Sequence, residues 1–160
     1  MIRKDLDEFL NRFQEYLKRG KDRDEDYVID LCDEVLNEKA LRQYGFDFLR
    51  GDSGKDGKPG RKLPVDAYYK SKNLVVEYNE RQHTESVALF DKKKTISGVS
   101  RGEQRKIYDK RRAEVLPQHG IRFIVISYDD FEYDGKKKIK RKREHDLEVI
   151  RKKLTDYLNA

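Results

Sequence analysis

The stretch PVDAYYKSKNLVVEYNERQH, residues 64–83, contains two short apolar segments separated by a polar turn. Valine and tyrosine are frequent in residues 65–69 and 74–79, which predicts two strands joined by a turn at residues 70–73. With a four-residue turn, Tyr69 pairs with Leu74, and Asp66 lies opposite Glu77. Facing side chains of an antiparallel pair have Cβ atoms about 5 Å apart. The sequence therefore predicts two carboxylates in close proximity.

Two carboxylates at this distance repel each other unless a positive group offsets their charge. Mg²⁺ is commonly held by one or two carboxylates, with water and substrate phosphate completing its coordination. We therefore expect Asp66 and Glu77 to bind Mg²⁺, with Mn²⁺ able to replace it. Asn79 shares the face of Glu77 because side chains alternate along a strand, so it could orient water or phosphate. His83 could act as an acid or base near neutral pH, or be a structural histidine.

The flanking sequence predicts a mixed α/β (α+β) domain, in which helices flank a mixed sheet. Residues 1–49 form a helical N-terminal part, residues 64–128 the core, and residues 129–160 a basic hairpin and a last helix. Within these parts we expect helices at 2–19, 27–44, 100–116 and 144–158, a central strand at 121–127, and inward positions for Leu147, Ile150, Leu154 and Leu158. The whole chain of 160 residues suits one domain.

Charge is distributed unevenly along the chain, whose net charge is +6. Residues 1–49 hold 9 Lys/Arg and 13 Asp/Glu, whereas residues 50–160 hold 28 and 18. Such a basic body favours a polyanionic partner, and DNA is the partner that we expect. The predicted contacts with the DNA backbone come from a Gly-rich loop at residues 51–62, from a lysine cluster after the strands and from a basic run at residues 136–143. These residues are Lys55, Lys58, Arg61, Lys62, Lys92, Lys93, Lys94, Lys136, Lys137, Lys138, Lys140, Arg141, Lys142 and Arg143.

The apolar residues and the cysteine content indicate an intracellular setting. No apolar run approaches the length of a membrane span, and the first residues lack the apolar segment of a secretory signal. Cys32 is the single cysteine, so it cannot form an internal disulfide. We therefore expect a cytoplasmic protein that does not bind membranes.

The ordered set of polar residues resembles the PD-(D/E)xK nuclease superfamily, in the branch around the very-short-patch repair endonuclease and its uncharacterised relatives. The match covers roughly residues 64–128. It departs from the family at Asn79, where a lysine is usual. The matching positions are "PVD" at 64–66, Glu77, Asn79, His83, Asp109, Arg112, Leu116, Gly120 and the strand IRFIVIS.

The resemblance implies a restriction-endonuclease-like fold and a Mg²⁺-dependent endodeoxyribonuclease. It implies that the carbonyl of Tyr78 joins Asp66 and Glu77 as a metal ligand, and that an acid of the first core helix completes the site. Glu38 is the first choice for this acid because it shares the inward stripe of that helix, and Glu34 is the alternative. The pair Asp109 and Arg112 is expected to be structural. A homodimer would supply the two active sites that cutting both strands requires.

Two other functions are compatible with the same residues. A catalytically inactive nucleic-acid-binding module of this fold would explain the missing lysine at Asn79. A non-enzymatic domain could instead bind an acidic protein through residues 136–143. Metal-dependent cleavage of DNA distinguishes the endonuclease from both alternatives.

Overall fold

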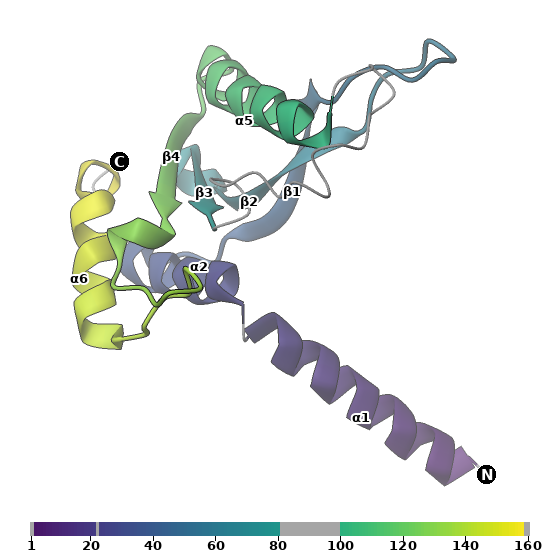
Figure 1. The fold of residues 1–160 in the computed structure, drawn as a ribbon, viewed down its shortest axis with the longest axis vertical. Coiled ribbons are helices and arrows are strands. Elements are labelled where there is room, and N and C mark those ends of the chain that lie inside the picture. Colours follow the sequence, from purple (N-terminus) through teal and green to yellow (C-terminus); the bar gives the residue numbers. More distant parts are fainter. Residues whose placement is uncertain (1, 22, 81–99, 159–160) are drawn as a thin grey trace.

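The computed structural model describes residues 2–21, 23–80 and 100–158. This part of the chain is a mixed α+β fold with a four-stranded sheet (Figure 1). No helix among these residues has the length and apolar character needed to cross a membrane. The helices and strands are α1 (Ile2–Lys21), α2 (Asp24–Leu36), β1 (Leu41–Arg50), β2 (Lys62–Tyr69), β3 (Leu74–Asn79), α5 (Arg101–Gln118), β4 (Arg122–Ser127) and α6 (Arg143–Lys153).

The predicted hairpin is confirmed as the link between β2 and β3. Tyr69 pairs with Leu74, and the antiparallel register continues through Ala67 and Val76. A 3₁₀ turn at Lys70–Lys72 connects the strands and ends at Asn73, whose φ of 46° lies in the left-handed region that asparagine tolerates. Continued by one residue, this register places Asp66 across from Glu77, as the turn length predicts.

The sheet has strand order β1-β2-β3-β4, with antiparallel pairing except between β3 and β4, which are parallel. Helix α5 covers one face, and α2 and α6 cover the other (Figure 1). Leu116 of α5 packs with Val75 in one core cluster, while Leu31 of α2 and Ile150 of α6 pack with Val76 in the other. The sheet is therefore buried on both sides, which holds the polar ends of its strands in fixed positions.

The helix predicted at residues 27–44 is wrong at its C-terminal end. Helix α2 begins earlier, at Asp24, and ends at Leu36. Asn37 closes it with a φ of 51° and donates its backbone N–H to the carbonyls of Asp33 and Glu34. Strand β1 then begins at Leu41 and pairs with β2, so the N-terminal part at residues 1–49 is not entirely helical.

Strand β4 was predicted to be central, and it instead lies at the edge of the described sheet. The strand is apolar along its length because its side chains alternate between the core clusters on the two faces of the sheet. Phe123 packs with the cluster on the α5 side, whereas Ile124 and Ile126 pack with the opposite cluster. Burial on both faces therefore does not require a central position.

The C-terminal elements match the predictions made from the sequence, with two differences in detail. Ser100 caps α5 by accepting a hydrogen bond from the N–H of Glu103, as the capping pattern predicts. The basic hairpin is reduced to one bridge between Tyr133 and Ile139. Leu158 lies beyond α6 and is 37% exposed, so its predicted inward position is wrong.

Candidate active site

The two facing carboxylates line a pocket of about 540 Å³ between the sheet and the helices. Phe123 and Val125 of β4 form part of its apolar wall. Polar side chains come from five other elements and from the residue before α2: Arg23, Glu25, Gln43, Asp66, Glu77, Asn79, Asp109 and Arg112. The structure thus gathers Asp66, Glu77 and Asn79 in one place, as the hairpin register predicts.

Asp66 and Glu77 are strongly coupled because they are close together and Glu77 is buried. The side chain of Glu77 is only 14% exposed. Burial and the neighbouring Asp66 raise the pKa of Glu77 to about 10. The backbone N–H of Tyr78 donates to Asp66 Oδ2 at 2.8 Å, which fixes the Asp66 carboxylate against β3. A cation in the pocket would relieve the repulsion that now favours a proton on Glu77.

Glu77 Oε1 is buried and accepts no hydrogen bond from any described residue. The guanidinium of Arg112 lies beside it, with Nε at 3.6 Å. Arg112 is held by other contacts, because it donates to Asp109 Oδ1 at 3.0 Å and to the carbonyl of Pro64 at 3.2 Å. The expected ion pair of Asp109 and Arg112 is confirmed, and it also supplies a guanidinium to the pocket wall.

Glu25 is a further carboxylate in this pocket, and sequence reasoning missed it. Burial and the charge of Asp66 raise the pKa of Glu25 to about 7. The amide of Gln43 joins the two acids, because Nε2 lies 2.8 Å from Glu25 Oε1 and 3.3 Å from Asp66 Oδ1. Gln43 has a φ of 50°, an uncommon conformation for a residue other than glycine. Such backbone strain often occurs at functional sites.

The helix acids chosen from the sequence lie elsewhere. Glu38 follows the end of α2 and accepts hydrogen bonds from the backbone N–H and Oγ of Ser71. Glu34 is exposed and forms an ion pair with Arg143. The signal that could have identified Glu25 is the acidic run at residues 24–26, because acids are favoured in the first turn of a helix.

The remaining predicted catalytic residues have different outcomes. Asn79 lines the pocket, on the same strand face as Glu77. The side chain of Tyr78 packs in the core on the opposite face, so only its backbone could serve the pocket, and the role of its carbonyl stays a prediction. His83, Lys92, Lys93 and Lys94 lie outside the described residues.

The donor set is compatible with a divalent cation, although it is not a preformed cage. No group of three or more His, Cys, Asp or Glu side chains in the described ranges is arranged to hold a metal ion. Mg²⁺ needs fewer protein ligands, because one or two carboxylates suffice when water and phosphate complete the shell. Asp66 and Glu77 Oε1, which accepts no hydrogen bond from a described residue, meet this requirement. Glu25 is a further acid within the same pocket.

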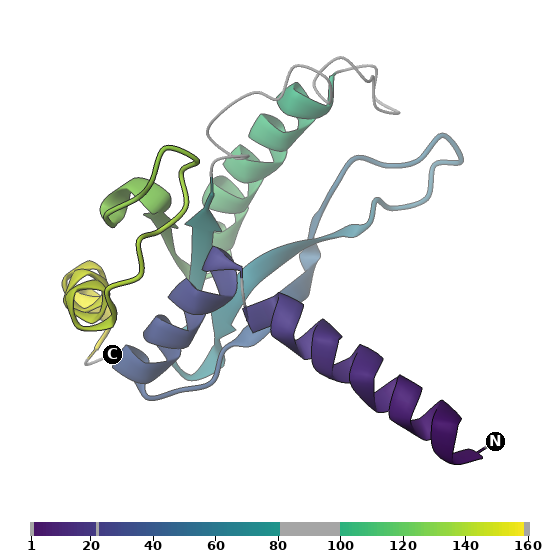
Figure 2. The same cartoon turned by 60° about the horizontal axis from the view of Figure 1, so that its bottom comes forward.

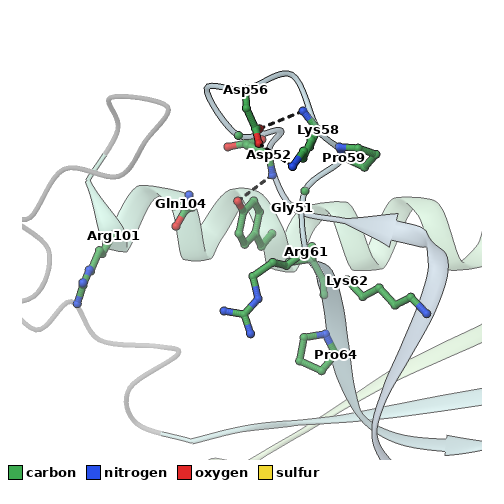
Figure 3. A pocket seen from close by; sticks show the side chains of 14 residues that line it. Gly51, Asp52, Asp56, Lys58, Pro59, Arg61, Lys62, Pro64, Arg101 and Gln104 are labelled. Atoms are coloured by element: carbon green, nitrogen blue, oxygen red, sulfur yellow. Dashed lines mark hydrogen bonds and ion pairs between the residues drawn. The ribbon is translucent and has the colours of Figure 1, made fainter.

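A second, larger pocket of about 1020 Å³ lies between the Gly-rich loop and the start of α5 (Figure 3). The loop is attached to α5 by Arg111, whose guanidinium donates to the carbonyl of Arg50 at 2.8 Å and to Asp52 Oδ1 at 3.1 Å. The hydroxyl of Tyr108 accepts from the N–H of Asp52 at 3.0 Å. We call this pocket the basic groove, lined by Gly51, Asp52, Gly54, Asp56, Lys58–Pro64, Arg101, Gln104 and Tyr108.

The loop is closed tightly at its base. The N–H of Gly51 donates to the carbonyl of Arg61 at 2.9 Å. A Cβ on Gly60 would lie 2.1 Å from the carbonyl oxygen of Gly51, so only glycine is compatible with this approach. The loop therefore presents its cations from a defined base rather than from a loose connection.

The cations of the basic groove differ in their partners. Lys58 lies 3.7 Å from Asp56, and Lys62 lies 2.7 Å from Asp47. Within the described part of the chain, neither Arg61 nor Arg101 has an ion-pair partner. Figure 3 shows both guanidinium groups away from the acidic side chains of the loop. These two arginines are thus available to an external anion.

The basic run at residues 136–143 is largely engaged within the protein. Arg141 pairs with the buried Asp24 at 3.2 Å, Lys142 pairs with Glu132 at 2.6 Å, and Arg143 pairs with Glu34. These contacts tie the hairpin to α2 and to itself. Among the other predicted contacts, Lys136, Lys138 and Lys140 are exposed, Lys137 lies over the ring of Tyr128, and Lys55 is exposed on the Gly-rich loop.

Comparisons with known proteins identify one similar sequence without an assigned function. The chain is 29% identical over 126 residues to "Uncharacterized protein 094L" of Frog virus 3 (isolate Goorha). The alignment covers 74% of this chain and 79% of the viral protein. No protein-family model matches the chain, and no solved structure matches it.

Proposed function

We propose that this protein is a Mg²⁺-dependent endonuclease that hydrolyses phosphodiester bonds in DNA. The observation that carries the proposal is the pair Asp66 and Glu77, which face each other in a pocket where Glu77 Oε1 is buried without a hydrogen bond. The proposal includes a restriction-endonuclease-like arrangement of the mixed sheet, which the PD-(D/E)xK resemblance implies. Restriction, repair and junction cleavage are all compatible with these residues, because a fold does not determine its substrate.

Asp66 and Glu77 would hold the metal, with the carbonyl of Tyr78 as a further ligand. Bound there, Mg²⁺ would activate water and stabilise charge on the scissile phosphate. Glu25 would accept a hydrogen bond from metal-bound water or join the ligands, in the place first given to Glu38. Asn79 and His83 would orient water or phosphate.

Arg112 is suited to a supporting role that the missing lysine leaves open. It is fixed by Asp109 and Pro64 and lies beside Glu77. A guanidinium in this position favours the charged form of Glu77, and thereby its use as a ligand. The second pocket cation, Arg23, pairs with Asp26 at 3.0 Å.

The basic groove would hold the DNA backbone outside the reaction centre. Arg61 and Arg101 are exposed and lack protein partners in the described ranges, so a phosphate can bind them without breaking an ion pair. Such contacts contribute affinity that does not depend on base sequence.

A catalytically inactive DNA-binding module is the second candidate. Asn79 favours this candidate, because the PD-(D/E)xK nucleases that the chain resembles usually have a lysine at this strand position. No lysine lines the described pocket. Under this alternative the carboxylates would be remnants, and the basic groove would carry the function.

A cleavage assay separates the two functions. Supercoiled plasmid, linear duplex, single strands and a branched duplex would each be incubated with EDTA, Mg²⁺ or Mn²⁺. Native protein would be compared with Asp66→Asn and Glu77→Gln, with Glu38→Gln as a matched acid outside the pocket. Metal-dependent cutting that both pocket variants lose and Glu38→Gln keeps is the expected result. No cutting of any substrate, with DNA binding intact, would leave the inactive module.

A further inference from the structure

Helix α1 has an apolar stripe that faces solvent. Figures 1 and 2 both show the helix extending away from the sheet and the other helices, which it joins near the start of α2. Four large apolar side chains on it are between 44% and 62% exposed, namely Leu6, Phe9, Leu10 and Phe13. Apolar stripes of this kind normally face a core or a partner, because their burial stabilises the helix.

The sequence of α1 follows the spacing of a two-helix contact. Leu6, Phe9, Phe13 and Tyr16 are separated by three, four and three residues, the alternation that forms a continuous seam between paired helices. Leu10 widens this seam on one side. The rings of Phe9 and Phe13 lie parallel, with centroids 6.2 Å apart, so they present one apolar surface.

Charges along α1 are segregated in a way that selects the direction of pairing. The first half, residues 2–11, has a net charge of −1, and the second half, residues 12–21, has a net charge of +3; the charged residues are Arg3, Lys4, Asp5, Asp7 and Glu8 in the first half and Arg12, Glu15, Lys18, Arg19 and Lys21 in the second. A parallel pair of these helices would place the two strongly basic second halves beside each other. An antiparallel pair would place each basic half beside a weakly acidic half, which lowers the electrostatic energy of the pair.

We propose that α1 is a dimerisation helix that pairs in antiparallel orientation with α1 of a second copy of this chain. In the register where Phe9 lies against Phe13 of the second copy, Leu6 lies opposite position 16, a tyrosine. Asp5 then lies beside position 19, an arginine, at both ends of the pair. One helix is thus complementary to itself in its apolar seam and in the charges at its two ends, as a two-fold interface requires.

The test measures the mass of the full chain by sedimentation from nanomolar to high micromolar concentrations, without metal or DNA. We expect a reversible dimer. Phe9→Glu should raise its dissociation constant by about 100-fold, because it places a charge in the seam. Asn11→Glu, which adds the same charge outside the seam, should change the dissociation constant by less than about twofold. Circular dichroism checks that both variants keep the folded body.

Charge reversal tests the antiparallel direction. Asp5→Lys and Arg19→Glu should each weaken the dimer by about fivefold, and the double variant should restore the native affinity. A parallel pair predicts instead that the double variant does not restore the affinity lost in the single variants. That result would overturn the proposal, as would a native protein that is monomeric at every concentration or a dimer that Phe9→Glu leaves intact.

Other occupants of the stripe give distinct results. A monomer that floats with lipid vesicles through α1 would assign the stripe to a membrane surface. A monomer whose body melts at lower temperature in Phe9→Glu would assign it to contacts within the chain. Either result would overturn the dimer, and neither depends on nuclease activity.

Discussion

The pocket around Asp66 and the basic groove beside α5 use charge in opposite ways. In the pocket, four acids and two arginines are crowded together, and burial raises the pKa values of Glu25 and Glu77. In the basic groove, Arg61 and Arg101 are exposed and have no ion-pair partner among the described residues. The pocket has the properties of a reaction centre, whereas the groove has those of a surface that attracts a polyanion.

This contrast predicts that chemistry and binding can be removed separately. Substitutions in the pocket should abolish cleavage and retain DNA affinity. Substitutions in the groove should weaken binding and leave the rate of the bound complex unchanged. A molecule in which both sets of variants changed both properties equally would contradict this division.

The largest effect is expected for the facing carboxylates. Asp66→Asn and Glu77→Gln should each lower single-turnover cleavage by about 1,000-fold, because each removes a charged ligand from the proposed metal site. Fluorescence anisotropy with labelled duplex should show affinity within about twofold of the native protein, because neither residue lies in the basic groove. Retention of cleavage by either variant would exclude this pair as the metal site.

An intermediate effect is expected for Glu25. Glu25→Gln should lower cleavage by about 10- to 100-fold, because Glu25 supports the site without being one of its two facing ligands. Glu38→Gln is the matched control, since Glu38 contacts Ser71 and lies outside the pocket. Loss of activity in Glu38→Gln with normal activity in Glu25→Gln would reverse the assignment made from the structure.

Local sequence patterns predicted the hairpin and its register. The turn length fixed the pairing of Tyr69 with Leu74, and alternation along β3 then placed Asn79 with Glu77. These relations depend on residues close in sequence, so strand periodicity is sufficient to find them.

Features that depend on distant contacts could not be predicted in this way. Glu25 reaches Asp66 because α2 packs across the sheet, and Gln43 reaches both because β1 pairs with β2. The end of α2 was also missed, since Asn37 stops the helix through its backbone conformation, whereas the apolar pattern continues to Leu41. The availability of Arg61 likewise depends on which acids lie nearby after folding.

A smaller effect is expected in the basic groove. Arg61→Ala and Arg101→Ala should each weaken duplex binding about two- to tenfold and lower the salt dependence by about one released ion. Lys62→Ala is the matched control, because Lys62 already pairs with Asp47 and should contribute less to binding. Affinity would be measured at several salt concentrations for each variant. The distinction would be refuted if all three variants showed the same reduction in the number of ions released on binding.

The smallest effect concerns stability, and it tests the crowding in the pocket without DNA. Because the pKa of Glu77 is raised to about 10, its contribution to the free energy of unfolding is fully present below the ordinary carboxyl pKa and is lost as pH rises towards 10. Glutamine mimics the protonated acid, so Glu77→Gln in EDTA should match the native protein in acid and be more stable by about 2 kcal/mol near pH 8.

Thermal melting across this pH range, with and without Mg²⁺, measures that difference. Saturating Mg²⁺ should stabilise the native protein and not the variant, because the metal replaces the proton as the group that offsets the Glu77 charge. The advantage of Glu77→Gln should therefore shrink or reverse when metal is added. A stability advantage of Glu77→Gln that is constant with pH and unaffected by Mg²⁺ would mean that the Glu77 carboxylate is neither repelled by Asp66 nor a metal ligand. The pocket would then no longer differ from the basic groove as a reaction centre differs from a binding surface.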